Sequence, residues 1–248
     1  MTVMMNEMTW QDFADKKDDA VVFLPVGSTE QHGPMLPLSV DQIISTGLAK
    51  MLAERVDGIV APCISYGYKS APLSGGGPAF PGTIDMNAVT LMNLVEDVLE
   101  ELIHDGVKKI FIMNGHFENE AFIRESMDLV SRRHEDVILF ESSWWDVMSD
   151  DVMAQVFDEV EYPGIELEHA GILETSMTMF FRPELVKWER FVEDGVEAFL
   201  PYGIYPASRC EVSETGLLTT ARTSSSKKGK LLADDITNAY VKLIEEWF

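Results

Sequence analysis

The sequence predicts a single α/β domain over residues 1–248, built as an α/β/α sandwich with a mostly parallel central sheet. The first observation is a set of short apolar runs without alternation, which is typical of strands buried on both faces. The second is that helical patterns separate these runs, and the resulting order βαβαβαβ favours parallel strands with helices on both faces. The chain is 46% hydrophobic, which is enough for one sizeable core.

Each element follows from a local pattern. Strands are expected where Val, Ile and Phe cluster, at residues 21–26, 58–64, 109–113 and 137–140. Helices are expected where apolar residues recur every three or four positions, at residues 41–56, 86–104, 118–133 and 230–247. Residues 70–83 and 199–230 are loop-like, and long loops of this kind are usually functional or make subunit contacts.

The formal net charge is −23 and the sequence pI is about 4.4. Nucleic acids and anionic membranes bind basic patches, so this composition argues against both as partners and leaves a small-molecule substrate. Cys63 and Cys210 form neither a metal-binding spacing nor a disulfide framework, and we expect both to be reduced. The sequence shows neither a membrane span nor a signal peptide, so the expected location is the cytoplasm.

Two of the predicted strands are followed by a histidine and a glutamate two residues apart. Glu30 and His32 follow the first strand, and His116 and Glu118 follow the third. Ligands of parallel sheets bind at the carboxyl ends of the strands, and residues i and i+2 of an extended segment point the same way. Imidazole and carboxylate ligands suit Zn, Mn or a related divalent ion. With Asp41 at the start of the next helix, the set favours two ions that share a carboxylate.

Simpler interpretations exist for each of these residues. A single histidine after a strand is often a hydrogen-bonded turn residue, and a single acid at a helix start is often a cap. Glu168 and His169 could transfer protons beside the metals, or could form a salt-bridged helix start. Trp144 and Trp145 could belong to the core or stack on a planar ligand. The Ser-Gly-Gly-Gly-Pro run lacks the features of a phosphate-binding loop.

Seven short motifs occur in one order along the chain. They are Leu-Pro-Val-Gly-Ser-Thr-Glu-Gln-His-Gly, Tyr-Gly-Tyr-Lys-Ser, Ser-Gly-Gly-Gly, Phe-Pro-Gly-Thr, Asn-Gly-His-Phe-Glu-Asn, Trp-Trp-Asp and Glu-His-Ala-Gly. Together they resemble the creatininase (creatinine amidohydrolase) family over roughly residues 8–245. The Tyr-Gly-Tyr-Lys-Ser to Phe-Pro-Gly-Thr segment points within that family toward creatininase proper.

The resemblance implies a site for two divalent ions, Zn, Mn or both, in a creatininase-like homohexamer. One ion would take Glu30 and His116, the other would take His32 and Glu118, and Asp41 would bridge them. Glu118, Glu168 and His169 are the implied catalytic residues, the last two as a proton-transfer pair. The implied substrate contacts are Ser74, Phe117, Trp145, Ile165 and Glu166.

The chain departs from the creatininase pattern at the position that covers the substrate. Creatininase has Trp-Asp ahead of its Glu-His, whereas Ile165 and Glu166 stand in those places here. An aliphatic side chain excludes water but loses aromatic stacking, which contributes about 1 kcal/mol. The expected function is metal-dependent hydrolysis of creatinine to creatine. The alternatives are hydrolysis of another heterocyclic amide, a formamide or a peptide, and a metal-stabilised binding protein without turnover.

Overall fold

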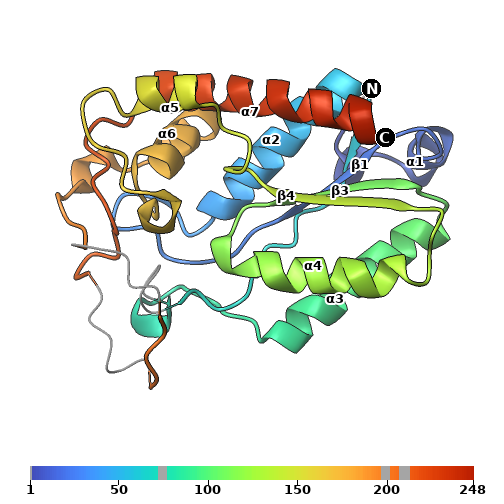
Figure 1. Cartoon of the computed structure of the whole chain (residues 1–248), viewed down its shortest axis with the longest axis horizontal. Coiled ribbons are helices and arrows are strands. Elements are labelled where there is room, and N and C mark those ends of the chain that lie inside the picture. Colours follow the sequence, from blue (N-terminus) through green and yellow to red (C-terminus); the bar gives the residue numbers. More distant parts are fainter. Residues whose placement is uncertain (1, 72–76, 197–201, 207–212) are drawn as a thin grey trace.

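The computed structural model describes residues 2–71, 77–196, 202–206 and 213–248 of the chain. It confirms the predicted α/β/α sandwich, in which a parallel four-stranded sheet lies between two layers of helices (Figure 1). The strand order is β2-β1-β3-β4. The strands are β1 (Val22–Val26), β2 (Ile59–Val60), β3 (Lys109–Asn114) and β4 (Ile138–Ser143).

The helices occupy both faces of this sheet. They are α1 (Trp10–Lys16), α2 (Val40–Val56), α3 (Ala88–His104), α4 (Glu120–Ser131), α5 (Asp150–Val156), α6 (Ile172–Phe181) and α7 (Ser226–Trp247). Short 3-10 helices lie at Met5–Glu7, Gly77–Ala79, Phe117–Asn119, Ile165–Leu167, Pro183–Leu185 and Trp188–Arg190. Helices α2, α6 and α7 pack together on one face, and α3 packs with α4 on the other (Figure 1).

Alternate residues of each central strand serve two separate hydrophobic cores. Phe23 of β1 and Phe111 of β3 belong to the core under α2, α6 and α7. Val22 and Leu24, their neighbours in β1, belong to the core under α3 and α4. Successive side chains of a strand point to opposite faces, so a strand covered on both faces has no polar side and reads as a continuous apolar run. This is the pattern that predicted β1 and β3.

Two strands differ from their predicted extents. The predicted strand 58–64 is regular only at Ile59–Val60. The N–H groups of Ile59 and Ala61 donate to Val21 O and Phe23 O, but Pro25, the next β1 residue that faces β2, has no N–H to donate in return. Pairing resumes where the Ile64 N–H donates to Pro25 O at 3.0 Å. The fourth strand is not buried on both faces as expected, since Ile138 is 41% exposed at the start of β4. As the edge strand, β4 has a neighbour on one side only.

Helix ends follow local capping chemistry. Helix α7 begins at Ser226 rather than at residue 230, because the Ser225 hydroxyl accepts the Lys228 N–H and caps the first turn. Helix α4 begins at Glu120, after the 3-10 turn that the prediction of 118–133 had included.

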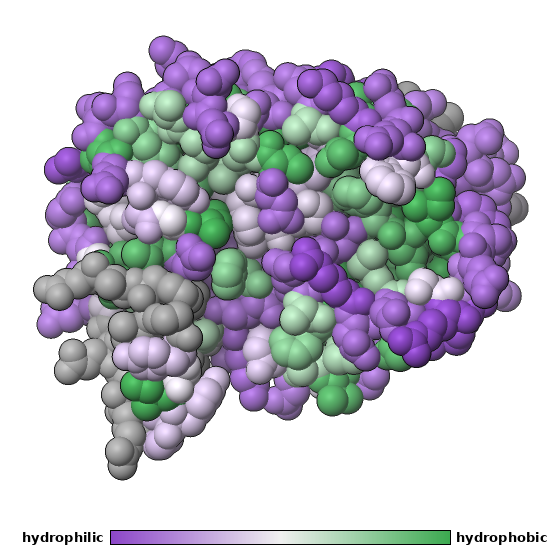
Figure 2. All heavy atoms as spheres, in the orientation of Figure 1, coloured by the Kyte–Doolittle hydropathy of each residue, from purple (hydrophilic) through white to green (hydrophobic). Residues whose placement is uncertain are grey.

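None of the helices in the described ranges combines the length and the apolar character needed to cross a bilayer. Hydrophilic side chains cover much of the face seen in Figure 2, in keeping with the net charge of −23.

The contact between α6 and α7 depends on a glycine. A Cβ on Gly229 of α7 would lie 2.0 Å from the Ser176 carbonyl oxygen of α6. That distance forbids any side chain unless the two helices separate, so glycine sets how closely they pack. The same packing holds the first turn of α6, which carries Glu174.

We expect Gly229→Ala to lower the free energy of unfolding by about 1–2 kcal/mol, because the cost of overpacking exceeds the gain in helix propensity. The matched control is Gly47→Ala in α2, whose Cβ would meet the Phe181 ring at 2.7 Å rather than a backbone atom. A ring at the end of a helix can shift, so this variant should stay within about 0.5 kcal/mol of the parent. Urea denaturation measures both variants, and equal stability of the two would show that Gly229 does not limit the approach of α6 and α7.

Candidate active site

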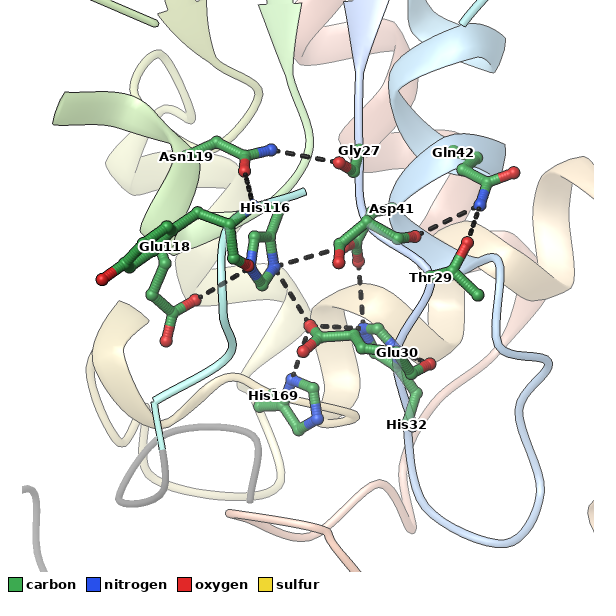
Figure 3. A network of polar contacts seen from close by, with 12 residues as sticks. Gly27, Thr29, Glu30, His32, Asp41, Gln42, His116, Glu118, Asn119 and His169 are labelled. Atoms are coloured by element: carbon green, nitrogen blue, oxygen red, sulfur yellow. Dashed lines mark hydrogen bonds and ion pairs between the residues drawn. The ribbon is translucent and has the colours of Figure 1, made fainter. Parts of the chain in front are cut away.

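The functional side chains gather at the carboxyl ends of β1 and β3, where the sequence predicts them. Glu30 and His32 follow β1, and His116 follows β3. All three are buried, with between 1% and 3% of their surface exposed. The prediction that the two histidine-bearing segments converge in space is confirmed by an ion-pair contact of 3.1 Å between His116 Nδ1 and Glu30 Oε1 (Figure 3).

Two glycines let the amino end of α2 approach these strand ends. A Cβ on Gly27 would lie 2.8 Å from the backbone nitrogen of Gln42, and a Cβ on Gly115 would lie 2.5 Å from Asp41 O. Any larger residue at either position would push α2 away. The close approach brings the side chain of Asp41, in the first turn of α2, between the two histidines (Figure 3).

Glu30, Asp41 and His116 form the first group of side chains that could hold a metal ion. His116 Nδ1 lies 3.1 Å from Glu30 Oε1 and 3.3 Å from Asp41 Oδ2. The ligand atoms of the group lie within 4.8 Å of one another. A single cation could therefore contact all three.

His32, Asp41 and Glu174 form a second such group. His32 Nε2 lies 3.1 Å from Asp41 Oδ1 and 3.5 Å from Glu174 Oε2. Asp41 thus turns Oδ1 toward His32 and Oδ2 toward His116, and it belongs to both groups. This is the position that a shared carboxylate would need.

The donor set fits divalent metal ions. Among the described residues, Glu30 Oε2, His32 Nε2 and Asp41 Oδ2 are buried without a hydrogen-bond partner. His32 Nε2 and Asp41 Oδ2 have ion-pair contacts of 3.1 and 3.3 Å, but buried polar atoms without hydrogen bonds are still unfavourable, and a bound cation would reduce that cost. Imidazole nitrogens combined with carboxylate oxygens are the ligands that Zn and Mn accept.

The pKa values of the two histidines also indicate that the carboxylates of the cluster favour positive charge beside them. Burial alone would lower the pKa of His32, but the carboxylates of Glu174 and Asp41 outweigh it and raise that pKa well above its usual value. Burial opposes a high pKa of His116 too, and Glu30 and Glu118 overcome it. The carboxylates therefore need either protonated histidines or metal ions beside them.

A third such group consists of Glu30, His32 and His169, and Glu118 lies outside all three. Its Oε2 is 3.3 Å from His116 Nε2, the ring nitrogen that points away from Glu30 and Asp41, and its Oε1 accepts the Ala71 N–H at 2.9 Å. The resemblance implies that Glu118 and His32 hold the same ion. In the structure Glu174, not Glu118, faces His32. Burial raises the pKa of the Glu118 carboxyl.

Glu174 is a candidate metal ligand that the sequence alone did not identify. It lies in the first turn of α6, without a histidine two residues away, and only the packing of α6 against α2 brings it to His32. A carboxylate in the turn that follows the Glu-His-Ala-Gly motif was the available signal. It was indistinguishable from an ordinary helix-start acid.

Glu168 and His169 both line the pocket above the cluster. His169 Nδ1 is 3.8 Å from Glu30 Oε1, and the His169 ring lies against the His32 ring with centroids 4.4 Å apart. Glu168 is 4% exposed and accepts the Leu173 N–H at 2.8 Å. Burial raises the pKa of Glu168 to about 8. Glu168 thus bonds the first turn of α6, and both members of the pair lie where they can reach the pocket.

Four of the five expected substrate contacts also line this pocket, namely Phe117, Trp145, Ile165 and Glu166. Phe117 and Trp145 stack with ring centroids 6.1 Å apart and an interplanar angle of 27°. Trp144, by contrast, is a core residue that is 1% exposed. The fifth contact, Ser74, lies outside the described residues.

Known proteins resemble this chain over its full length. The family described as "Creatininase: Creatinine amidohydrolase" matches residues 6–244. A creatinine amidohydrolase of Pseudomonas putida is 35% identical over 254 residues, which cover 100% of this chain and 98% of that protein. A mycofactocin precursor peptide peptidase of Mycobacterium tuberculosis is 28% identical and covers 91% of this chain and 85% of that protein.

Solved structures agree with the sequence comparisons. A creatininase in a Mn form has a TM-score of 0.93 at 35% identity, covering 100% of this chain and 99% of that one. A variant creatininase of Zn-Zn type gives the same TM-score, identity and coverage. Fold, length and sequence therefore lead to one conclusion: the chain belongs to the creatininase family of hydrolases.

Proposed function

We propose that this hydrolase cleaves the C–N bond of a cyclic amide, with creatinine and water as substrates and creatine as product. The observation that carries the proposal is the pair of buried histidine–carboxylate groups that share Asp41, beneath a pocket that contains His169 and Glu168. The 35% identity with the P. putida creatinine amidohydrolase supports creatinine as the substrate.

The two groups would hold two divalent ions, Zn, Mn or both. Glu30, Asp41 and His116 would hold one ion, and His32, Asp41 and Glu174 would hold the other. Bound ions would act as a Lewis acid toward the amide carbonyl and would lower the pKa of water to about 7. The forms called Mn and Zn-Zn among the related creatininases support this choice of metals.

Proton transfer falls to His169 and Glu168. When water adds to the ring carbonyl and the C–N bond breaks, the leaving nitrogen needs a proton. His169 presents Nδ1 toward the cluster, 3.8 Å from Glu30 Oε1, and this atom donates that proton. Glu168, whose pKa burial raises to about 8, holds a proton at neutral pH and is the second donor in the pocket.

The pocket walls suit a small planar substrate. Phe117 and Trp145 offer aromatic faces, and Glu166 offers a carboxylate to the amino-bearing edge of a creatinine ring. Phe117 is 42% exposed, so its ring is available for stacking. Glu118 hydrogen-bonds Ala71 and contacts His116, and it completes the acidic wall.

Ile165 favours a second candidate function, the hydrolysis of another small amide, formamide or peptide. It stands where creatininase has a tryptophan over the substrate, and its smaller side chain leaves more room above the ring. The mycofactocin precursor peptide peptidase among the relatives has a peptide substrate in its name, which supports keeping this candidate.

We also propose a homo-oligomer, on the resemblance a hexamer, in the cytoplasm. Large exposed side chains such as Trp10 at 76% and Tyr205 at 79% support subunit contacts. Cys63 is a free thiol, which suits a reducing compartment.

A creatinine-to-creatine assay tests the function directly. The protein is stripped of metal with a chelator and reloaded with Mn or Zn separately. We expect turnover of roughly 1–1,000 per second with at least one metal and none with the chelated protein. Absence of turnover in fully loaded protein would reject creatinine, and formamides and short peptides would be assayed next.

Metal content separates the roles of Glu174 and Glu118. We expect Glu174→Gln to bind about one ion fewer per chain, because Glu174 faces His32 in the second group. Glu118→Gln is the matched variant. It should keep its metals but lose turnover by about 100-fold or more. Metal analysis of purified protein measures the first effect, and loss of an ion only from Glu118→Gln would restore the ligand pairing that the resemblance implies.

The buried carboxyl of Glu168 predicts a pH dependence of stability in the metal-free protein. Its pKa is about 8 in the folded protein, against an ordinary value of 4.5. The contribution of the protonated carboxyl to stability is therefore complete below pH 4.5 and is lost as pH rises to about 8. Glu168→Gln abolishes this loss. Between pH 5 and pH 8 the variant should gain about 2–4 kcal/mol of unfolding free energy relative to the parent.

Urea denaturation at the two pH values, with chelator present, gives this difference. The control is Glu166→Gln, which removes an exposed carboxyl two residues away. It should change stability by the same small amount at both pH values. If Glu168→Gln also changed stability by the same amount at pH 5 and pH 8, Glu168 would be ionised in the folded protein at neutral pH.

A further inference from the structure

The His169 ring is held from the side that faces away from the metal-binding groups. Its Nε2 lies 2.9 Å from the backbone carbonyl oxygen of Gln31 and 3.0 Å from the side-chain nitrogen of the same residue. Gln31 is 5% exposed, and it stands in the chain between the candidate ligands Glu30 and His32. One residue thus contacts the same ring nitrogen with a backbone acceptor and a side-chain donor.

The orientation of the Gln31 amide is determined by its other contacts. The side-chain nitrogen donates to Gly216 O at 3.0 Å, and the side-chain oxygen accepts the Gly33 N–H at 2.8 Å. A reversed amide would set two oxygens against each other at Gly216 and two N–H groups against each other at Gly33. The side-chain nitrogen must therefore face His169.

This arrangement provides a partner for Nε2 whichever way the ring carries its protons. When Nε2 bears a proton, it donates to the Gln31 carbonyl oxygen. When Nε2 bears a lone pair, it accepts from the Gln31 side-chain N–H. The ring has no need to rotate in search of a partner, so Nδ1 stays directed toward Glu30 and the pocket.

A distant segment of the chain closes on this contact. Gly216 has φ +85° and approaches so closely that a Cβ there would lie 1.9 Å from Gln31 Oε1. Two residues later, the Leu218 N–H donates to His169 O at 3.3 Å. Residues 216–218 therefore hydrogen-bond both the Gln31 side chain and the His169 backbone, and only glycine fits at position 216.

We propose that Gln31 is a positioning residue that holds the His169 ring with Nδ1 toward the reacting bond. Gln31 acts through His169 and is not itself one of the residues that line the pocket. The inference rests on the proposed function, because it assigns His169 the proton transfer of that reaction. It adds Gln31 and Gly216 to the residues on which the rate depends.

The test is a double-mutant cycle with creatinine and metal-loaded protein. Gln31→Met keeps the length of the side chain and removes its donor and acceptor. In the parent background it should lower kcat by about 10- to 100-fold, with KM changed by less than about threefold and metal content unchanged. In the His169→Ala background the same substitution should have no further effect on kcat. An equal loss in both backgrounds, or no loss in the parent, would overturn the proposal.

Gln42→Met is the matched control. Gln42 donates from its side chain to Ser28 O, Thr29 Oγ1 and Ser65 O, and none of these residues lines the pocket. It should lower the melting temperature while leaving kcat within about threefold of the parent. If Gln31→Met does not fold, Gly216→Ala takes its place and should give the same selective loss of kcat.

A crystal structure of Gln31→Met supplies a readout that needs no turnover. We expect the His169 ring to rotate or to occupy two orientations, and an unchanged ring would overturn the proposal. This readout also separates the two hypotheses. A parent enzyme that is inactive on every amide tested rejects the proposed function, whereas an active parent whose Gln31 variant keeps its rate and ring orientation rejects the role of Gln31 alone.

Discussion

The concentration of buried charge around Asp41 is the constraint on which the rest of the structure depends. Glu30, Asp41 and Glu174 meet His32 and His116 in a space from which water is almost excluded. Three carboxylates against two imidazoles cannot be neutral without added positive charge, and a buried unpaired carboxylate is strongly unfavourable. The site therefore needs protons or cations beside its carboxylates, so the geometry that is unfavourable without them is the geometry that would hold metal ions.

The scaffold meets this constraint by bringing rigid elements together at one edge of the sheet. Gly27 and Gly115 remove the side chains that would keep α2 away from β1 and β3. Gly229 does the same between α6 and α7, and so holds the turn that carries Glu174. Each glycine lies where two backbones approach, and each lets a ligand from one element reach the others. Short-range packing thus sets the distances of the whole cluster.

The two sides of His169 have different tasks. Nδ1 faces the charged cluster, while Nε2 contacts Gln31. The Gln31 side chain in turn donates to Gly216 O and packs against that glycine. In the proposed reaction His169 is a proton donor, and the residues that would fix its orientation lie outside the pocket lining. Ile165 and Glu166, by contrast, belong to the pocket wall, where a change of residue alters which substrate fits and leaves the metal-binding groups intact.

The sequence by itself determined the parallel sheet, the ends of its strands and most of the candidate metal ligands. Strand-end positions and periodicity are local features, and Glu30, His32, Asp41 and His116 all follow from them. Only the tertiary structure decided that Glu174, not Glu118, faces His32, and that Gly216 reaches Gln31 across 185 residues of chain. The physical reason is that helix packing sets these contacts, and no local pattern records which distant turn a helix brings to a strand end.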